Sequence, residues 1–191
     1  MKIQMTTLAR SIFWALICGT TALFAQEMPE MPEMPKPTQE HAWLEKFAGE
    51  WTTEMECTME PGKEPMKGSA TEKARMLGGF WLISDGEGEM MGSKFSNILT
   101  LGYDPEKKVY VGTWVDSMTS LLWKYEGTVN AQGTSLTLTS EGPCPMKGGK
   151  ICKFRETMEL KDPNHKVFTS QILEDDGTWK TMMTARSTKK G

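Results

Sequence analysis

The sequence predicts an all-β protein, an antiparallel meander closed into a β-barrel of about ten strands and preceded by a short N-terminal helix. Three observations predict this class. Short segments in which apolar and polar residues alternate follow one another from residue 50 onward. Glycine, proline, asparagine and aspartate separate these segments, as in tight hairpins. No helical periodicity occurs in this region, and a long meander tends to close because open sheet edges promote aggregation.

Residues 1–25 are expected to be a secretory signal peptide. The stretch MKIQMTTLAR carries positive charge and no acid, and the apolar stretch SIFWALICGTTALFA that follows it ends in small residues. Cleavage after Ala25 would place the protein outside the cytoplasm, secreted or periplasmic, and free of the membrane. Two alternatives remain open. An uncleaved anchor would need a longer apolar stretch, and lipidation at Cys18 would need a small residue where Ile17 stands.

Residues 26–37 are expected to form a linker rich in methionine and proline. The triplet Glu-Met-Pro occurs three times in a row over residues 27–35, and proline at every third position favours polyproline II. In that conformation Met28, Met31 and Met34 line one edge of the linker. Thioethers are soft ligands, so this edge is a candidate Cu(I) site. The alternative is a tether whose methionines have no role in binding.

The predicted barrel domain occupies residues 38–191. The segment 38–47 is expected to be the helix, with Thr38 as its cap and Gly49 at its end. The first strand alternates strictly from Trp51, which shares one face with Thr53 and Met55. The expected strands run near residues 50–59, 67–77, 79–89, 95–103, 108–116, 121–129, 134–141, 151–160, 166–174 and 178–187.

The charge of the chain argues against nucleic acid as a partner. The net charge is −3, and removal of residues 1–25, which contain Lys2 and Arg10 but no acid, would change it to −5. A nucleic-acid-binding protein normally presents a basic face. We therefore expect neither a nucleic-acid partner nor a membrane partner after signal cleavage.

The cysteine spacing predicts one disulfide. Beyond the signal peptide the chain contains Cys57, Cys144 and Cys152. The Gly148-Gly149 pair allows a chain reversal between the last two, and an oxidising compartment favours their pairing. Closing such a short loop contributes roughly 2–3 kcal/mol. The alternative is three free thiols, and the spacing matches no zinc site.

The start of the first strand resembles that of the lipocalins and other calycin barrels. A short helix followed by Gly49-Glu50-Trp51 is similar to the Gly-X-Trp motif of these proteins, in which the helix closes one end and the tryptophan plugs it. In lipocalins a basic side chain from near the end of the barrel packs on this tryptophan. The resemblance implies that Arg186, within 182-MMTARSTK-189, packs on Trp51, a cation–π contact of about 0.5–2 kcal/mol.

A narrower resemblance extends over residues 36–187. The stretches 78-GGFWLISDGEGEM-90, 99-LTLGYDPEKKVYVGTWVDS-117 and 171-QILEDDGTWKTMMTAR-186 resemble a bacterial domain family of unknown function that is often secreted and calycin-like. This resemblance implies a fold and no catalytic residues. The related nitrobindins bind haem through a histidine. Here His41 and His165 are both expected at the surface, so neither haem nor another cofactor is expected.

Several residues are candidates for a ligand site in the barrel. The aromatic candidates are Trp81, Trp114, Trp123 and Tyr125, each of which can also be ordinary core packing. In the strand 151–160 the apolar alternate positions are Cys152, Phe154, Met158 and Leu160. This pattern places Arg155 outside. A bulge that inverted the strand would instead turn Arg155 inward, where its guanidinium could anchor a carboxylate.

The best-supported functional hypothesis is an extracytoplasmic β-barrel that binds a small hydrophobic or amphipathic ligand. The first alternative is a structural or interaction module with a filled barrel and no enzymatic activity. A Cu(I)-binding protein and an enzyme have less support. With two histidines, both expected at the surface, nucleophilic catalysis has few candidate bases, and we expect no catalytic residues.

Overall fold

The computed structural model describes residues 33–58 and 62–191. The chain divides into two units, residues 1–35 and 36–191, and the barrel is the second. The predicted signal peptide and two of the three linker methionines, Met28 and Met31, lie outside the described residues, whereas Met34 is described and exposed. No helix in the described part of the chain is long and apolar enough to cross a membrane.

The predicted N-terminal helix is present, in two pieces. An α-helix, α1 (Gln39–Leu44), continues as a 3₁₀ helix, η1 (Glu45–Phe47). At its start the backbone N–H of Thr38 donates to Nδ1 of His41 at 3.0 Å. His41 is buried and packs edge-to-face on Phe80. The expectation that His41 lies at the surface is therefore wrong, because its ring caps the helix against the barrel.

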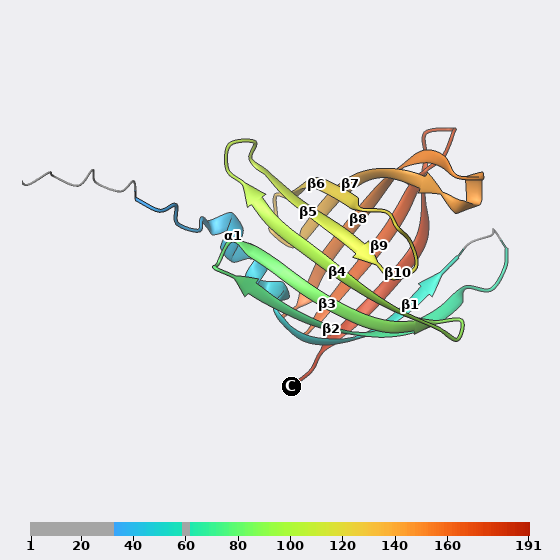
Figure 1. The fold of residues 1–191 in the computed structure, drawn as a ribbon, viewed down its shortest axis with the longest axis horizontal. Helices are drawn as coiled ribbons and strands as arrows, with labels where there is room; N and C mark the ends of the chain where they lie inside the picture. The colour runs from blue at the N-terminus through green and yellow to red at the C-terminus, as the bar shows by residue number, and fades with distance from the viewer. Residues whose placement is uncertain (1–32, 59–61) are drawn as a thin grey trace, which may run out of the picture. The chain divides into compact units, whose positions relative to one another are not determined.

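Ten antiparallel strands form one closed sheet (Figure 1). Each strand pairs with its neighbours in sequence, and the first pairs with the last, so the predicted meander barrel is confirmed. The strands are β1 (Gly49–Cys57), β2 (Met66–Leu77), β3 (Trp81–Met90), β4 (Ser93–Asp104), β5 (Val109–Asp116), β6 (Trp123–Val129), β7 (Ser135–Cys144), β8 (Lys150–Asp162), β9 (His165–Leu173) and β10 (Trp179–Lys189). A second 3₁₀ helix, η2 (Pro145–Lys147), precedes β8.

The glycine of the Gly-X-Trp motif has a structural requirement of its own. Gly49 joins η1 to β1 with a φ of 127°, which lies in the region that side chains rarely adopt. A Cβ at this position would come within 2.5 Å of Cε of Lys189. Glycine therefore allows the chain to pass from the helix into β1 beside the last residue of β10.

The larger apolar cluster lies at the end of the barrel that the helix covers, and a second, smaller cluster is formed by Cys144, Phe154 and Ile172 of β7, β8 and β9. Side chains of the helical segment pack against inward-facing residues of strands on several sides of the barrel. The largest fully buried members of the larger cluster are Leu44, Phe47, Leu82, Leu101 and Leu136. Trp43 of α1 packs on Tyr110 of β5 with ring centroids 5.7 Å apart. The helix therefore seals this end by filling it.

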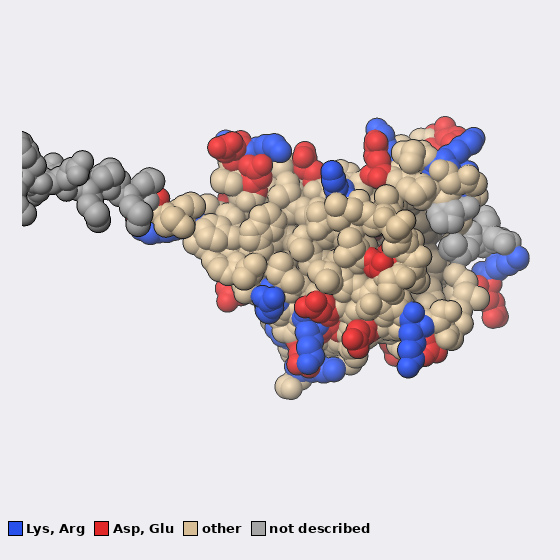
Figure 2. Space-filling model, in the orientation of Figure 1, with Lys and Arg blue, Asp and Glu red and all other residues tan. Residues whose placement is uncertain are grey.

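Acidic and basic side chains are mixed on the outer surface. Figure 2 shows them around the margins of one face, with few charges over its middle, where β4 and β5 lie. The exposed apolar side chains of these two strands include Ile98 and Val115. No broad region of a single charge is visible on this face.

Trp51 closes the helix end of the barrel, as the motif implies, but the cationic side chains that pack on its indole are lysines. The indole is fully buried, and its Nε1 donates to the carbonyl of Phe47 at 2.9 Å. Nζ of Lys166 lies 4.5 Å from the ring centroid and Nζ of Lys189 lies 5.3 Å from it. Lys166 is itself buried and pairs with Glu72 at 2.7 Å.

The expected contact between Arg186 and Trp51 is wrong. Ala185 and Ser187 face the interior, so Arg186 between them faces outward. Its side chain is 64% exposed and lies 3.8 Å from Glu56. The residue opposite Trp51 on β10 is Lys189, and the lysine therefore takes the place expected for the arginine.

We predict that Lys166→Met destabilises the barrel by about 3 kcal/mol, because it leaves Glu72 unpaired in a largely buried site and removes a cation from the face of Trp51. Urea denaturation measures the change. Arg186→Met is the control, with an expected effect below about 1 kcal/mol because its ion pair is exposed. Equal effects of the two substitutions would contradict this account of how Trp51 closes the barrel.

Candidate functional site

The middle of the barrel is not packed like the sealed end. In the described strands inward-facing side chains alternate with exposed ones, but several inward ones are only half-buried. Examples are Thr53 of β1, Ala70 of β2, Phe95 and Asn97 of β4, and Trp114 of β5. Partial exposure at inward positions means that the interior admits solvent there. The barrel therefore contains space beyond its apolar core.

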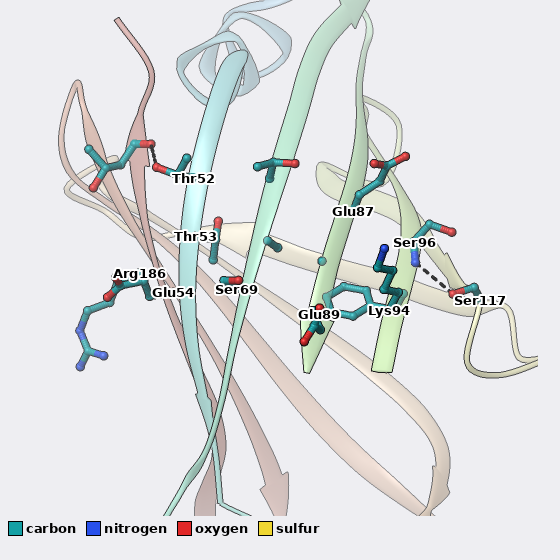
Figure 3. A pocket seen from close by; sticks show the side chains of 15 residues that line it. Thr52, Thr53, Glu54, Ser69, Glu87, Glu89, Lys94, Ser96, Ser117 and Arg186 are labelled. Atoms are coloured by element: carbon teal, nitrogen blue, oxygen red, sulfur yellow. Dashed lines mark hydrogen bonds between the residues drawn. The ribbon is translucent and has the colours of Figure 1, made fainter. Parts of the chain in front are cut away.

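A hollow of about 1040 Å³ follows the wall made by β1 to β4 (Figure 3). Its lining includes the inward-facing Thr53, Ala70 and Phe95, together with outward-facing charged side chains such as Glu87 and Lys94. In Figure 3 Arg186 points away from the strands that line the hollow. Most of the side chains that line it face outward, so this hollow lies largely on the outer surface of the wall and is not a site inside the barrel.

Glu156 of β8 and Ser140 of β7 form an unusual polar group on the side of the barrel opposite β3. Glu156 of β8 faces the interior and is only 7% exposed. Its Oε1 accepts a hydrogen bond from Oγ of Ser170 of β9 at 3.1 Å. Its other oxygen, Oε2, has no hydrogen-bond partner, and neither has Oγ of Ser140 of β7. Buried polar atoms are nearly always paired, so these two atoms indicate a place where a partner is missing.

Burial controls the ionisation of this carboxyl. Loss of solvent raises the pKa of Glu156 to about 7, and the Ser170 hydrogen bond opposes this shift only in part. Near neutral pH the carboxyl is therefore divided between its charged and uncharged forms. A cation or a hydrogen-bond donor beside Oε2 would favour the charged form.

Tyr125 and Asp116 extend the polar group toward β5. Burial raises the pKa of Tyr125 well above its usual range, and the charges of Glu156 and Asp116 raise it further. The Tyr125 hydroxyl is therefore a neutral donor. Oδ2 of Asp116 accepts from Nε1 of Trp114 at 3.1 Å, and Oδ1 accepts from the backbone of Met118 at 2.8 Å. Asp116 is thus satisfied by its own strand and turn, unlike Glu156.

Aromatic rings surround these polar atoms. Phe154 pairs with Ser140 across β7 and β8. Trp123 meets Phe154 edge-to-face with centroids 5.1 Å apart. The Trp123 ring occupies the space that a side chain at Gly142 would need. The inward face of β5 to β8 thus combines aromatic rings with a partly unpaired carboxyl and hydroxyl.

The structure brings together three of the five predicted ligand residues. Trp114, Trp123 and Tyr125 all face the interior. Trp81 does not, because Leu82 beside it faces the core; the indole is 41% exposed and covers Gly102 on the outer wall. Whether the three inward rings contact a ligand stays a prediction.

Arg155 also lies outside, so the inverted arrangement that would turn it inward is wrong. Its Nε and Nη2 donate to Oε1 of Gln171 at 2.9 and 2.7 Å. Its guanidinium lies 4.4 Å from the ring centroid of Trp179. The register of β8 and β9 is regular at this point, and no bulge reverses the strand there.

Cys144 and Cys152 are neighbouring thiols, not a disulfide, in the structure. They face inward from β7 and β8, where Cys152 pairs with Gly142. Burial raises the pKa of Cys152, and the charge and hydrogen bond of Cys144 raise it further. The predicted loop therefore brings the two sulfurs together, while the bond itself stays a prediction. Cys57 is half-buried on the inward face, as the alternation predicts.

The described residues contain no group of three or more His, Cys, Asp or Glu side chains arranged to hold a metal ion. His165 is the first residue of β9, directly after the β8–β9 turn, and its Nδ1 is 2.8 Å from Asp162. His41 is committed to the helix cap. Neither histidine faces the space between Glu156 and the aromatic rings.

Comparison with known proteins places this barrel in a family. A family model described as "Protein of unknown function (DUF1579)" matches residues 36–189. The chain belongs to the DUF1579 family. The matched region begins at the helix and includes all ten strands, so the DUF1579 domain is the barrel itself. A search of curated proteins finds no match.

Solved structures share the fold of this DUF1579 barrel at low sequence identity. The crystal structure of Rv2717c from M. tuberculosis matches with a TM-score of 0.58 at 10% identity, covering 82% of this chain and all of that one. The S-type phycobiliprotein lyase CPES from Guillardia theta matches with a TM-score of 0.50 at 13% identity, covering 82% of this chain and 99% of the lyase. At sequence identities this low, the similarity shows a shared fold and nothing about function.

Sequence reasoning missed Glu156, Ser140 and Ser170. A signal for Glu156 existed, because it occupies the one position of the apolar alternation in the strand 151–160 that carries a charge. An acid at an inward position of a strand is either paired or functional. The two serines carry no such signal, since serine is common on both faces of strands.

We predict that the stability of the protein falls as the pH rises from about 5 to 8, because Glu156 binds its proton more tightly when folded. A pKa raised to about 7 makes the folded state hold more protons than the unfolded state in this range. The loss in the free energy of unfolding approaches roughly 3 kcal/mol at about pH 8. Glu156→Gln should remove this component of the pH dependence, as measured by urea midpoints at several pH values.

The matched control is Glu159→Gln, on the outer face of the same strand, where the carboxylate is partly exposed beside Lys161. It should leave the pH dependence of the wild-type protein unchanged. A Glu156→Gln protein with the wild-type slope would show that the buried carboxyl is not the titrating group.

Proposed function

We propose that this DUF1579 protein binds a small, mostly apolar ligand inside its barrel, outside the cytoplasm. The observation that carries the proposal is the pair of unpartnered buried atoms, Oε2 of Glu156 and Oγ of Ser140. Across the strands Glu156 is paired with Leu138 and Ser140 with Phe154, and the Phe154 ring contacts Trp123. Binding sites for small molecules have this composition, a mainly apolar lining with a few polar groups that orient the ligand.

The shape of the interior supports the same function. The strands β3 and β8 are five positions apart in both directions around the ring, so their inward faces look at each other across the barrel. The half-buried Ala70 and Phe95 approach the interior from the first wall, and Glu156 does so from the second. The helix and Trp51 close one end, which leaves the other for entry.

An enzymatic role has less support. Ser170 donates to Glu156, but neither histidine faces this pair to act as a general base. The likeness to a phycobiliprotein lyase concerns the fold at 13% identity. The filled barrel is the alternative that the next experiment tests directly.

We predict that an environment-sensitive apolar dye, such as N-phenyl-1-naphthylamine, binds the wild-type protein with increased dye emission and quenched tryptophan fluorescence. Ala70→Trp should reduce this binding at least tenfold, because it places an indole in the half-buried interior. Thr71→Trp, one residue along β2 on the exposed face, is the control and should bind as the wild type does. If no dye or lipid in a broad panel binds, the barrel is filled.

The location outside the cytoplasm is supported by residues 1–25 and by the adjacent thiols of Cys144 and Cys152. We predict that protein recovered from the producing cells begins at Gln26.

We also predict that tryptic digestion without reductant yields the peptide containing Cys144 linked to Ile151-Cys152-Lys153. Mass spectrometry checks both. An intact Met1, or two unlinked peptides from oxidised preparations, would contradict the corresponding half of the prediction.

A further inference from the structure

The signs of the inward-facing charges point to the chemistry of the ligand. In the middle of the barrel Tyr125 of β6 lies near the charges of both Glu156 and Asp116 of β5. From the flanking strands β7 and β9 the residues that face Glu156 are the uncharged Leu138, Ser140 and Ser170. The groups around Glu156 are therefore acidic or neutral.

Basic residues at inward positions of the described strands occur only near the strand ends. At the sealed end Lys166 is held by Glu72, and Lys189 lies over Trp51. At the other end Lys180 lies 4.0 Å from Glu174, and Lys150 is exposed. No basic side chain of the described chain is therefore placed to neutralise Glu156 or to receive an anionic headgroup beside it.

We propose that the ligand is an organic ammonium ion with an apolar body, its N–H groups donating to Glu156 and Ser140. This inference rests on the proposed ligand-binding function and specifies its substrate class. An ammonium group has several donors and no acceptor, so it supplies what Oε2 of Glu156 and Oγ of Ser140 lack. A carboxylate ligand would instead meet Glu156 and Asp116 as like charges.

The aromatic lining favours the same class. The faces of tryptophan, tyrosine and phenylalanine attract cations, and this attraction strengthens when the cation is removed from water. Trp123 and Phe154 are in contact, and Tyr125 is close enough to Glu156 to respond to its charge. The apolar body of the ligand would pack on these rings while its nitrogen reaches the carboxyl.

Binding of this kind depends on pH in a defined direction. An ammonium ion pairs with the charged carboxylate, and burial keeps that carboxylate protonated in the empty barrel below about pH 7. Affinity should therefore rise as pH increases from 5 to 8 and then level off. Asp116 accepts hydrogen bonds from Trp114 and from the backbone of Met118, so it is occupied by partners of its own.

The test uses two fluorescent probes that differ in the charge at the end of their chain. N-Dansylcadaverine ends in a primary ammonium group, and dansyl-6-aminohexanoate ends in a carboxylate. Binding to the full-length protein is followed by energy transfer from tryptophan to dansyl. At pH 8 we expect the ammonium probe to bind at least tenfold more tightly than the carboxylate probe, and its affinity to fall at least fivefold at pH 5.

Glu156→Gln should lower the affinity for the ammonium probe at least tenfold at pH 8 and have little effect on it at pH 5. Ser140→Ala, a smaller change, should weaken it by a few fold. Glu159→Gln should bind as the wild type does, and circular dichroism verifies that all three variants fold. Unchanged binding by both Glu156→Gln and Ser140→Ala would overturn the inference.

The outcomes separate this inference from the function on which it rests. If the carboxylate probe binds as tightly as the ammonium probe, or only neutral dyes bind, the ammonium assignment is wrong and ligand binding stands. If neither probe nor any neutral dye binds, both are wrong.

Discussion

The pairing of β1 with β10 is the constraint on which the rest of the structure depends. It closes the ring and sets Trp51 opposite Lys189. Side chains alternate between the two faces of a strand, so a shift of one residue would exchange every inward and outward position. Glu54 and Lys73 would then enter the barrel, and Trp51 would leave it.

The barrel changes in character along its axis. At the helix end leucines and aromatic rings fill the interior, and the ionic pair of Lys166 with Glu72 is complete. Farther along, inward positions are half-buried, and the polar groups are incompletely paired. The helix end holds most of the fully buried apolar side chains, so its packing contributes most to the stability of the barrel.

The barrel and most of its strand alternation are predictable from the sequence because both follow from local rules. Turn residues delimit the hairpins, and the apolar period of two assigns faces, which is why Trp114, Trp123 and Tyr125 are correctly expected inside. The same rule places Arg155 outside. Trp81, expected inside because of its large aromatic ring, lies outside because its neighbour Leu82 takes the inward position of β3.

Other parts of the site depend on long-range register. Arg186 and Lys189 both lie near the end of β10, and only the pairing with β1 decides which of them meets Trp51. Lys166 reaches the same ring from β9, which no local pattern indicates. Likewise, the partners of Glu156 come from β7 and β9, so its incomplete pairing becomes visible only when the strands are assembled.

The contrast between two acids within the same barrel is the strongest argument for a binding site. Glu72 faces inward at the sealed end and has Lys166 at 2.7 Å. Glu156 faces inward in the middle and is deeply buried, yet one of its oxygens has no partner. A buried carboxylate without a counter-charge costs several kcal/mol, and at the first position Lys166 supplies that charge. At the second position the protein instead favours the protonated carboxyl, since burial raises the pKa of Glu156 to about 7, and a cationic ligand of the proposed kind would take the place of that proton.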